Sequence, residues 1–175
     1  DLTFIGRGQP IHTGGFSNNF TYKAFNLNVF FQWSYGNDIY NANRLIMEGN
    51  SNGWANINQF ASYSNRWSPE NPTNENYRTR GQGPIGFHSS RVVEDGSFLR
   101  MKTVSLNYNL PAKLIKTAYL SSLSVNVSAQ NLITWTNYSG MDPEVSTRNN
   151  TLTPGFDYSS YPRSPTIAFG IKAGF

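Results

Sequence analysis

The sequence predicts an all-β fold, an antiparallel segment of a transmembrane β-barrel, and two observations point to it. Several stretches of about ten residues alternate between apolar and polar side chains, as strands with lipid on one side and a lumen on the other must. The chain also ends on such a stretch, at Phe175, without a polar tail. A soluble domain usually ends in a polar, loosely ordered segment instead.

The composition suits an exported all-β protein with long polar loops. Charged residues make up 14% and aromatic residues 15% of the chain, whereas average soluble proteins are about 25% charged. The mean hydropathy is −0.49, so polar uncharged residues rather than apolar ones replace the missing charges. No apolar run approaches the roughly 18 residues that a transmembrane helix needs.

Other features restrict the functional classes. Cysteine is absent, which excludes a disulfide framework, a thiol nucleophile and a Cys-based metal site. The net charge of +4 comes from scattered Lys and Arg residues, so nucleic acid is not an expected partner. The chain shows no signal peptide and starts at Asp1, so we expect a processed chain or an internal or C-terminal piece.

Two strands are expected at residues 11–22 and 25–35, joined by a short connection. The second has the clearest alternation in the chain, and its length of about ten residues matches a tilted membrane strand. Its apolar face consists of Phe25, Leu27, Val29, Phe31, Trp33 and Tyr35. Aromatic residues lie at both ends of this face, as in the interface girdles of outer-membrane barrels. An amphipathic strand of a soluble sandwich is the alternative for this stretch.

A long region without strand periodicity follows at residues 36–96. We expect one short helix in it, from about Ile39 to Met47, because apolar residues recur there at helical spacing. The rest of the region is rich in Asn, Ser and Pro. A loop of this length is uncommon inside a compact domain and is usually functional.

Three more strands are expected at residues 97–110, 123–134 and 165–175, each alternating apolar residues with polar or small ones. The connection at residues 111–122 is short and basic, and one helical turn fits within it. The connection at residues 135–164 is a second long loop, rich in Gly and Pro.

The order of these connections fits an outer-membrane barrel. Short and long connections alternate, as short periplasmic turns and long extracellular loops do in that class. With the long loops outside, the chain ends on the periplasmic side. The five expected strands are an odd number and cannot close a membrane barrel by themselves, and lipid does not tolerate unpaired strand edges. We therefore expect the remaining strands to lie outside this sequence.

Four blocks of the sequence carry a family resemblance. They read FFQWSYGNDIYN (30–41), SFLRMKTVSLNYNLP (97–111), VSAQNLITWTNYSGMDPEV (127–145) and YPRSPTIAFGIKAGF (161–175). In this order they resemble the C-terminal end of SusC/RagA-type TonB-dependent transporters. The resemblance covers nearly the whole chain.

The resemblance implies a plugged barrel of roughly 22 strands in the bacterial outer membrane, with residues 1–175 as its C-terminal portion. It implies energy supplied by the TonB complex through a plug, and neither the plug nor a TonB box is matched here. It also implies a SusD-like surface lipoprotein that captures glycans or peptides. Phe169, Ile171 and Phe175 resemble the terminal signal that the barrel-assembly machinery reads by strand addition. The plainer interpretation of these three residues is lipid contact alone.

Three aromatic residues of the first long loop, Trp54, Tyr63 and Trp67, are candidates for contact with a ligand or a partner. Aromatic rings stack on the apolar faces of sugars, and Tyr and Trp favour interfaces. Packing within the loop is the alternative for all three.

No catalytic residue, cofactor or metal is expected. His12 and His88 are the only histidines and lie far apart in the sequence. Asp142, Glu144 and Asp157 share one loop, where a calcium site is the alternative to solvated carboxylates, but no EF-hand spacing supports it.

The sequence thus predicts part of a TonB-dependent importer of oligomeric nutrients, and not an enzyme. Two other classes remain open at this point. One is a passive or structural outer-membrane barrel, and the other is a soluble carbohydrate-binding β-sandwich.

Overall fold

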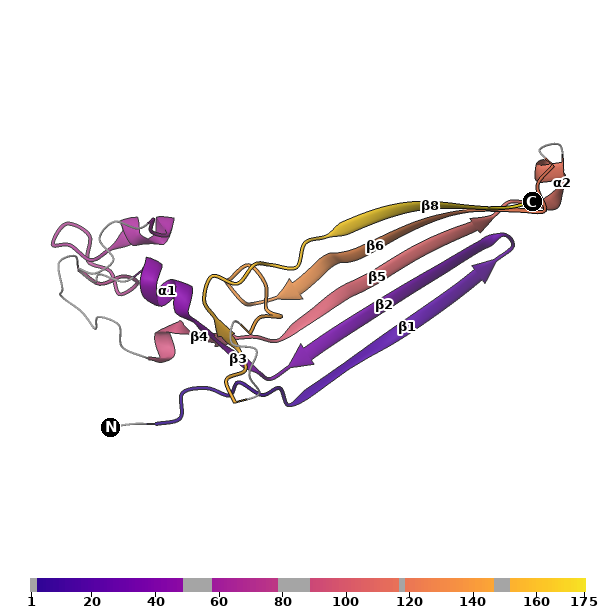
Figure 1. The fold of residues 1–175 in the computed structure, drawn as a ribbon. Coiled ribbons are helices and arrows are strands. Elements are labelled where there is room, and N and C mark those ends of the chain that lie inside the picture. Colours follow the sequence, from indigo (N-terminus) through magenta and orange to yellow (C-terminus); the bar gives the residue numbers. More distant parts are fainter. Residues whose placement is uncertain (1–2, 49–57, 79–88, 117–118, 147–151) are drawn as a thin grey trace. The chain divides into compact units, whose positions relative to one another are not determined.

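The computed structural model describes residues 3–48, 58–78, 89–116, 119–146 and 152–175 (Figure 1). The chain forms two compact units. The first, called the sheet unit below, comprises Ile11–Tyr35, Ser97–Asn137 and Pro162–Phe175. The second, called the loop unit, comprises Asp1–Pro10, Gly36–Gly96 and Tyr138–Tyr161.

The sheet unit is one antiparallel sheet with the strand order β1-β2-β5-β6-β8 (Figure 1). Its strands are β1 (His12–Tyr22), β2 (Phe25–Tyr35), β5 (Phe98–Asn109), β6 (Ser122–Thr136) and β8 (Thr166–Gly174). Every strand begins and ends within two residues of the bounds expected from the sequence. Neighbouring strands are consecutive within the sheet, which is an up-and-down arrangement.

The register places apolar residues of all five strands on one face. Directly opposed residues of an antiparallel pair share a face, and Leu27 is opposite both Phe20 and Leu106. The same row continues through Val127 to Phe169. A shift by one residue would turn each apolar set to the other face, so this register maintains the two faces predicted from the sequence.

A bulge in β5 preserves the apolar face along its whole length. Opposite β2, Lys102 is an extra residue between Met101 and Thr103. Because side chains alternate with a period of two, an uninterrupted strand would turn Met101 toward the polar face and Arg100 toward the apolar one. With the bulge, Arg100 shares the face of Gln32. The alternation of residues 97–110 does not by itself predict this bulge.

Both short connections lie at the same end of the sheet. Lys23 and Ala24 join β1 to β2, and Lys23 adopts the left-handed conformation, with a φ of 53°. The single turn of helix expected between β5 and β6 is present as α2 (Ala112–Ile115). Ile115 is buried, whereas Leu114 is exposed.

The loop unit contains a second, three-stranded sheet that the sequence analysis did not predict. In it β3 (Asp38–Asn41) pairs antiparallel with β4 (Val93–Asp95) and parallel with β7 (Phe156–Asp157). These strands have two to four residues each, which is too short for a period-2 pattern to stand out.

Short helices complete the loop unit. They are α1 (Ala42–Met47) and the 3₁₀ helices η2 (Ala61–Asn65) and η3 (Ser90–Val92). The predicted helix is thus confirmed in part, but its start at Ile39 is wrong. Ile39 lies in β3 and is 0% exposed, and the side chain of Asn41 caps α1 by accepting a bond from the Arg44 amide. Among the described residues, none of the helices has the length and apolar character needed to cross a membrane.

Candidate functional site

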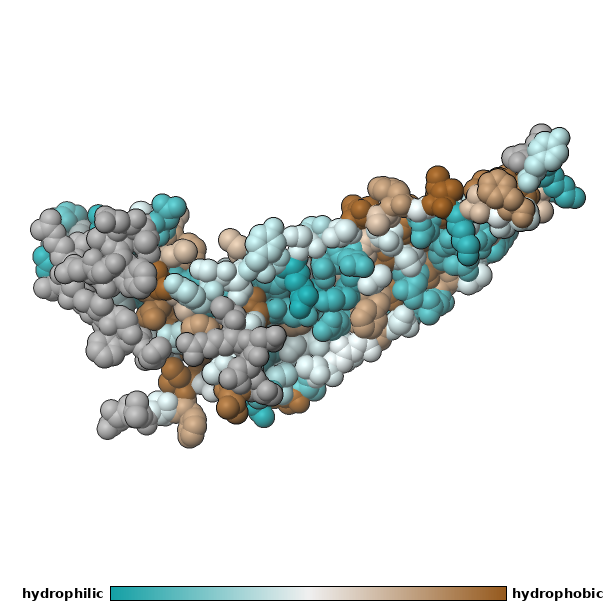
Figure 2. All heavy atoms as spheres, viewed as in Figure 1, coloured by the Kyte–Doolittle hydropathy of each residue, from teal (hydrophilic) through white to brown (hydrophobic). Residues whose placement is uncertain are grey.

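The apolar face of the sheet unit is exposed. Phe16, Phe20, Leu106, Ile133 and Ile167 all leave a large part of their side chains uncovered on this face. In Figure 2, brown apolar residues project along the β8 edge, while teal polar residues lie over the middle of the sheet. A soluble sandwich would cover such a face with a second sheet. An exposed apolar face of this extent needs lipid or another protein against it.

The opposite face of the sheet carries a ladder of small polar side chains. Asn28 donates hydrogen bonds to Ser17 Oγ at 3.2 Å and to Asn19 Oδ1 at 2.6 Å. Thr21 donates to Asn26 Oδ1 at 3.0 Å. Side chains that satisfy one another in this way suit a face that borders water rather than lipid.

Gly170 of β8 completes this polar face because it leaves room for its neighbour. It lies opposite Asn126, and a Cβ added at Gly170 would overlap the Asn126 amide. The missing side chain therefore allows the amide to lie flat across β8. This is a packing requirement, which alternation alone does not reveal.

Replacing Gly170 by Val is expected to destabilise the folded protein by about 1–3 kcal/mol through overpacking. The measurement is the temperature at which the full-length protein loses its folded band in an unheated detergent gel. Ala168→Val is the matched control, because Ala168 lies on the same face and already has a Cβ. Combining Gly170→Val with Asn126→Ala should recover much of the loss, and no recovery would contradict the contact.

Aromatic rings cluster on the apolar face at the end away from the short connections. Phe16 and Phe31 stack with ring centroids 4.8 Å apart, and Trp33 lies over Gly14, where no side chain intervenes. Trp33 Nε1 donates a hydrogen bond to His12 Nδ1 at 3.1 Å. His12 is therefore a hydrogen-bond acceptor for an aromatic girdle, while His88 lies outside the described residues.

The three residues predicted as an assembly signal belong to the last strand or follow it. Phe169 and Ile171 lie on the apolar face of β8 and are 79% and 77% exposed, and Phe175 is 96% exposed. Exposure of this kind fits both lipid contact and strand recognition. Their role in assembly stays a prediction.

The predicted ligand-contact residues are only partly described. Trp54 lies outside the described residues. Tyr63 belongs to η2, and Trp67 is 36% exposed. An arginine lies over each ring, Arg66 at 5.6 Å from the Tyr63 centroid and Arg78 at 5.8 Å from that of Trp67. These cation–π pairs are contacts within the loop, which was the alternative for these residues, and contact with a ligand or partner stays a prediction.

The loop unit is held together by a carboxylate that the sequence analysis missed. Glu94 of β4 accepts four hydrogen bonds. The Ser139 amide and hydroxyl donate at 2.9 Å each, and Asn41 Nδ2 and Arg44 Nη1 donate at 3.1 Å each. Three segments far apart in the sequence therefore meet at this one carboxylate.

The same network extends through a second carboxylate. Arg44 pairs with Glu48 at 3.2 Å, and Arg91 reaches Glu48 at 3.4 Å. Arg91 also donates to Asn76 Oδ1 at 2.6 Å, and the buried Asn76 donates to the Ser62 carbonyl at 2.6 Å. This chain of contacts, called the Glu94 network below, ties η2 and η3 to α1 and β4.

Electrostatics favour the charged form of Glu94. Burial alone would raise its pKa, but the hydrogen bonds from Ser139, Arg44 and Asn41 outweigh burial and lower the pKa below its ordinary value. Burial raises the pKa of Tyr138, and the adjacent Asp157 raises it further. Tyr138 therefore stays protonated and donates to Asp157 at 2.6 Å.

Because the pKa of Glu94 is lowered on folding, its contribution to stability is full above the ordinary pKa and is lost as the pH falls through the lowered one. We expect the amides of the loop unit to lose protection from hydrogen exchange as the pH is taken from neutral into the acid range. Hydrogen-exchange mass spectrometry of the full-length protein, corrected for intrinsic exchange rates, measures this. Glu94→Gln should remove most of that pH dependence. An unchanged acid profile in this variant would contradict the assignment.

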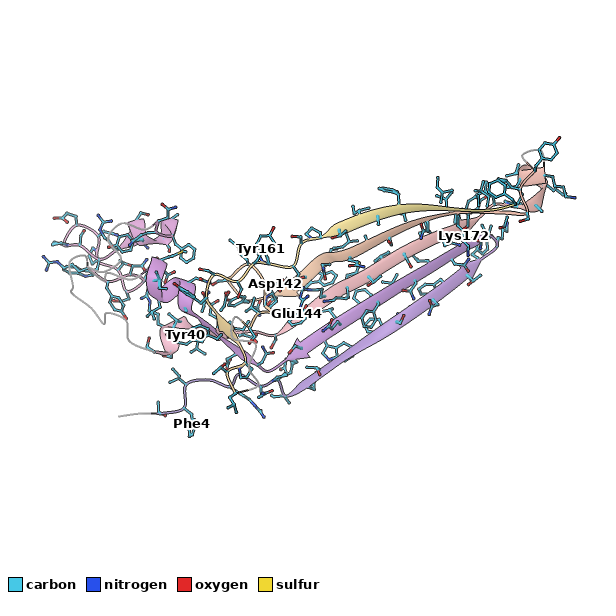
Figure 3. The ribbon with its side chains drawn as sticks, viewed as in Figure 1. Phe4, Tyr40, Asp142, Glu144, Tyr161 and Lys172 are labelled. Atoms are coloured by element: carbon cyan, nitrogen blue, oxygen red, sulfur yellow. The ribbon has the colours of Figure 1, made fainter. Side chains whose placement is uncertain are left out.

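The expectation of solvated carboxylates in the second long loop is wrong for two of three residues. Asp142 and Asp157 are buried, and Asp142 accepts a hydrogen bond from the Glu144 amide at 2.8 Å (Figure 3). Short polar segments that turn inward bury carboxylates together with their donors. Within the described part of the chain, no three His, Asp or Glu side chains cluster so as to hold a metal ion.

Comparisons with known proteins agree on one family. No protein-family model matches the chain. TonB-dependent receptor P3 of Formosa agariphila is 37% identical over 180 residues, covering 100% of this chain and 17% of the relative. TonB-dependent receptor P26 of the same organism is 33% identical over 180 residues, covering 100% of this chain and 18% of the relative.

Solved structures that match include those of a peptide importer. The RagAB peptide importer in its open-open state superposes with a TM-score of 0.78 at 29% identity, covering 95% of this chain and 17% of that chain. Its closed-closed state gives a TM-score of 0.79 at 28% identity, with the same coverage. The chain thus spans less than a fifth of the length of these relatives.

Proposed function

Because this chain belongs to the SusC/RagA group of TonB-dependent outer-membrane transporters, we propose that it forms part of the barrel wall of a nutrient importer. The observation that carries the proposal is the sheet with one exposed apolar face and one polar face. That arrangement separates lipid from an aqueous lumen. The relatives are named as receptors and importers, which supports a transport role, and we propose that this role involves no chemical step.

The wall needs further strands to close. β1 and β8 are the two edges of the sheet, and an unpaired edge in lipid leaves backbone groups without partners. We propose that residues 1–175 are the C-terminal portion of a plugged barrel of roughly 22 strands, with β8 pairing to a strand from the rest of that barrel. The plug and its contact with the TonB complex belong to that remainder.

The alternating connections suggest an orientation. We propose that the two short connections face the periplasm and the two long ones the cell exterior, as in other outer-membrane barrels. The long connections make up most of the loop unit, in which the Glu94 network joins α1 and β4 to the backbone at Ser139. A preorganised surface binds partners at a lower entropic cost, and we propose a SusD-like lipoprotein as the partner.

The substrate proposed is an oligomer, either a peptide or a glycan. The two superposed structures are titled a peptide importer, which favours peptides. The exposed ring of Trp67 and the partly exposed ring of Tyr63 also suit sugar faces, so glycans stay within the proposal.

Uptake by cells tests the function. A strain that lacks the full-length protein should lose uptake of labelled peptides or oligosaccharides, and the complemented strain should regain it only when TonB is present. Uptake that persists without TonB would favour the passive barrel instead.

The soluble carbohydrate-binding sandwich has a separate test. A folded, sugar-binding monomer from residues 1–175 in buffer without detergent would support it. We expect aggregation, because the apolar face lacks a cover.

Deleting Phe175 from the full-length protein is expected to lower its outer-membrane level severalfold. The physical reason is strand addition, in which alternate side chains of the added strand fill pockets on the receiving machinery. Phe175→Tyr, which keeps an aromatic ring, should restore most of the level. Quantitative immunoblotting of outer-membrane fractions measures both variants, and an unchanged level after the deletion would leave Phe175 with lipid contact alone.

A further inference from the structure

Acidic and basic residues are divided unequally between the two units. All ten Asp and Glu residues of the chain belong to the loop unit, and the sheet unit has none. Every lysine of the chain belongs to the sheet unit. The basic residues of the sheet unit are Lys23, Arg100, Lys102, Lys113, Lys116, Arg163 and Lys172. The Lys and Arg side chains of the sheet unit are therefore its only charged side chains.

Most of these lysines gather at one end of the sheet. Lys23 lies in the β1–β2 connection, and Lys113 and Lys116 lie in and directly after α2, between β5 and β6. All three are exposed. Lys172 of β8 pairs with Ser124 close to the same end (Figure 3).

Backbone hydrogen bonds hold the two short connections next to each other. The amide of Asn109, at the end of β5, donates to the Ala24 carbonyl at 2.9 Å. The next amide, of Leu110, donates to the Leu123 carbonyl of β6 at 2.9 Å. The three exposed lysines therefore lie at one end of the sheet unit, on connections that begin next to each other.

Exposed apolar and aromatic side chains accompany these lysines. Lys23 Nζ lies 5.2 Å from the ring centroid of the exposed Tyr22. Leu114 of α2 is exposed, and Tyr119 is 93% exposed. Lysines beside exposed Tyr and Leu side chains are typical of a membrane–water interface, where the apolar parts enter the lipid and the ammonium groups reach the headgroups.

We propose that Lys23, Lys113 and Lys116 bind the phosphate groups of anionic phospholipids in the leaflet that borders the short connections. This rests on the proposed function, which places the sheet unit in a membrane. Each ammonium group offers three donors to phosphate oxygens, and the sheet unit contains no Asp or Glu side chain to compete for them.

The position of the lysines favours lipid over an acidic polypeptide as the bound partner. Tyr22 and Phe25 are opposite each other on the apolar face and flank the connection that carries Lys23. Lys23 therefore continues directly from the apolar face that is proposed to contact lipid. Lys172 is excluded from the lipid site, because it shares the polar face with Ser124.

The test uses the full-length transporter refolded into vesicles of phosphatidylcholine with a minor share of phosphatidylglycerol. Mass spectrometry of the lipids that remain bound after extraction gives the preference for phosphatidylglycerol. The triple variant K23Q/K113Q/K116Q is compared with K172Q, which removes the same kind of charge from the polar face at the same end. Glycerol phosphate, added in excess, shows whether a free phosphate competes for the site, and an acidic peptide tests the other class of partner.

We expect the wild-type protein and K172Q to retain phosphatidylglycerol preferentially. In the triple variant, the preference for phosphatidylglycerol should fall by a factor of roughly five for each lysine removed. An unchanged preference in the triple variant would overturn the proposal. So would loss of the preference in K172Q, or displacement of the lipid by the acidic peptide. Competition by glycerol phosphate alone, without lipid preference, would make the site a free-anion site and would also overturn it.

The vesicle experiment separates this proposal from the function on which it rests. Refolding is followed by the folded band in an unheated detergent gel. If the protein does not insert into vesicles at all, the barrel proposal fails. If it inserts but shows no preference among the lipids, only the lysine site fails.

Discussion

Replacing Phe169 by Arg is expected to lower the free energy of unfolding in a bilayer by about 2–4 kcal/mol and to reduce the amount of protein in the outer membrane. Phe169 lies near the middle of β8 on the apolar face and is highly exposed. An Arg at this position would place a guanidinium group in hydrocarbon. The measurement is the midpoint of guanidinium unfolding of the full-length protein in vesicles, together with its outer-membrane level.

The neighbouring residue supplies the matched control. Ala168 lies on the polar face opposite Ser128, so Ala168→Arg introduces the same side chain one position away but on the lumen side. We expect this variant to cost much less than Phe169→Arg. Equal effects of the two variants would show that the faces are not divided between lipid and water, and would remove the observation that carries the proposed function.

Replacing Glu94 by Ala is expected to open the loop unit while leaving the sheet unit folded. The variant deprives Arg44 of one carboxylate partner and leaves Asn41 and Ser139 without their acceptor. Breaking a largely buried, charge-assisted cluster of this kind costs about 3 kcal/mol. Hydrogen-exchange mass spectrometry should show faster exchange around β3, β4 and Ser139, and uptake of substrate should fall with it.

Glu70→Ala is the control for the loop unit, because Glu70 is an exposed carboxylate in the same unit. Its exchange pattern should match that of the wild-type protein. Glu94→Gln, which keeps one carbonyl oxygen as an acceptor, should fall between the two. If Glu94→Ala leaves the exchange of the loop unit unchanged, the network is not what holds the unit together.

The sheet unit was largely predictable because its signal is local. Side chains along a strand alternate with a period of two, and β2, from Phe25 to Tyr35, shows that alternation throughout except at Phe30, which lies on the polar face. Strand bounds, faces and the short connections follow from such patterns. The bulge at Lys102 was not predictable, because it shows only when β5 is paired with β2 and the faces of Arg100 and Met101 are compared.

The loop unit was largely unpredictable because its contacts join distant residues. Asn41, Glu94 and Ser139 are separated by more than forty residues at each step, and none of them stands in a recognisable motif. The strands β3, β4 and β7 form only because they pair with one another, so no single stretch carries their pattern. The burial of Asp142 and Asp157 likewise depends on donors that folding supplies.

The sequence alone therefore determined the two-faced sheet and, through its resemblance to known transporters, the family. The alternation of apolar and polar residues in a strand is visible in consecutive residues, and a strand between lipid and an aqueous lumen requires it. Only the tertiary structure decided that Glu94 is the centre of the loop unit and that the connection carrying Lys23 is hydrogen-bonded to the end of β5, from which the chain enters α2. The Glu94 network and the group of lysines at one end of the sheet both consist of residues that are distant in the sequence and come together only on folding.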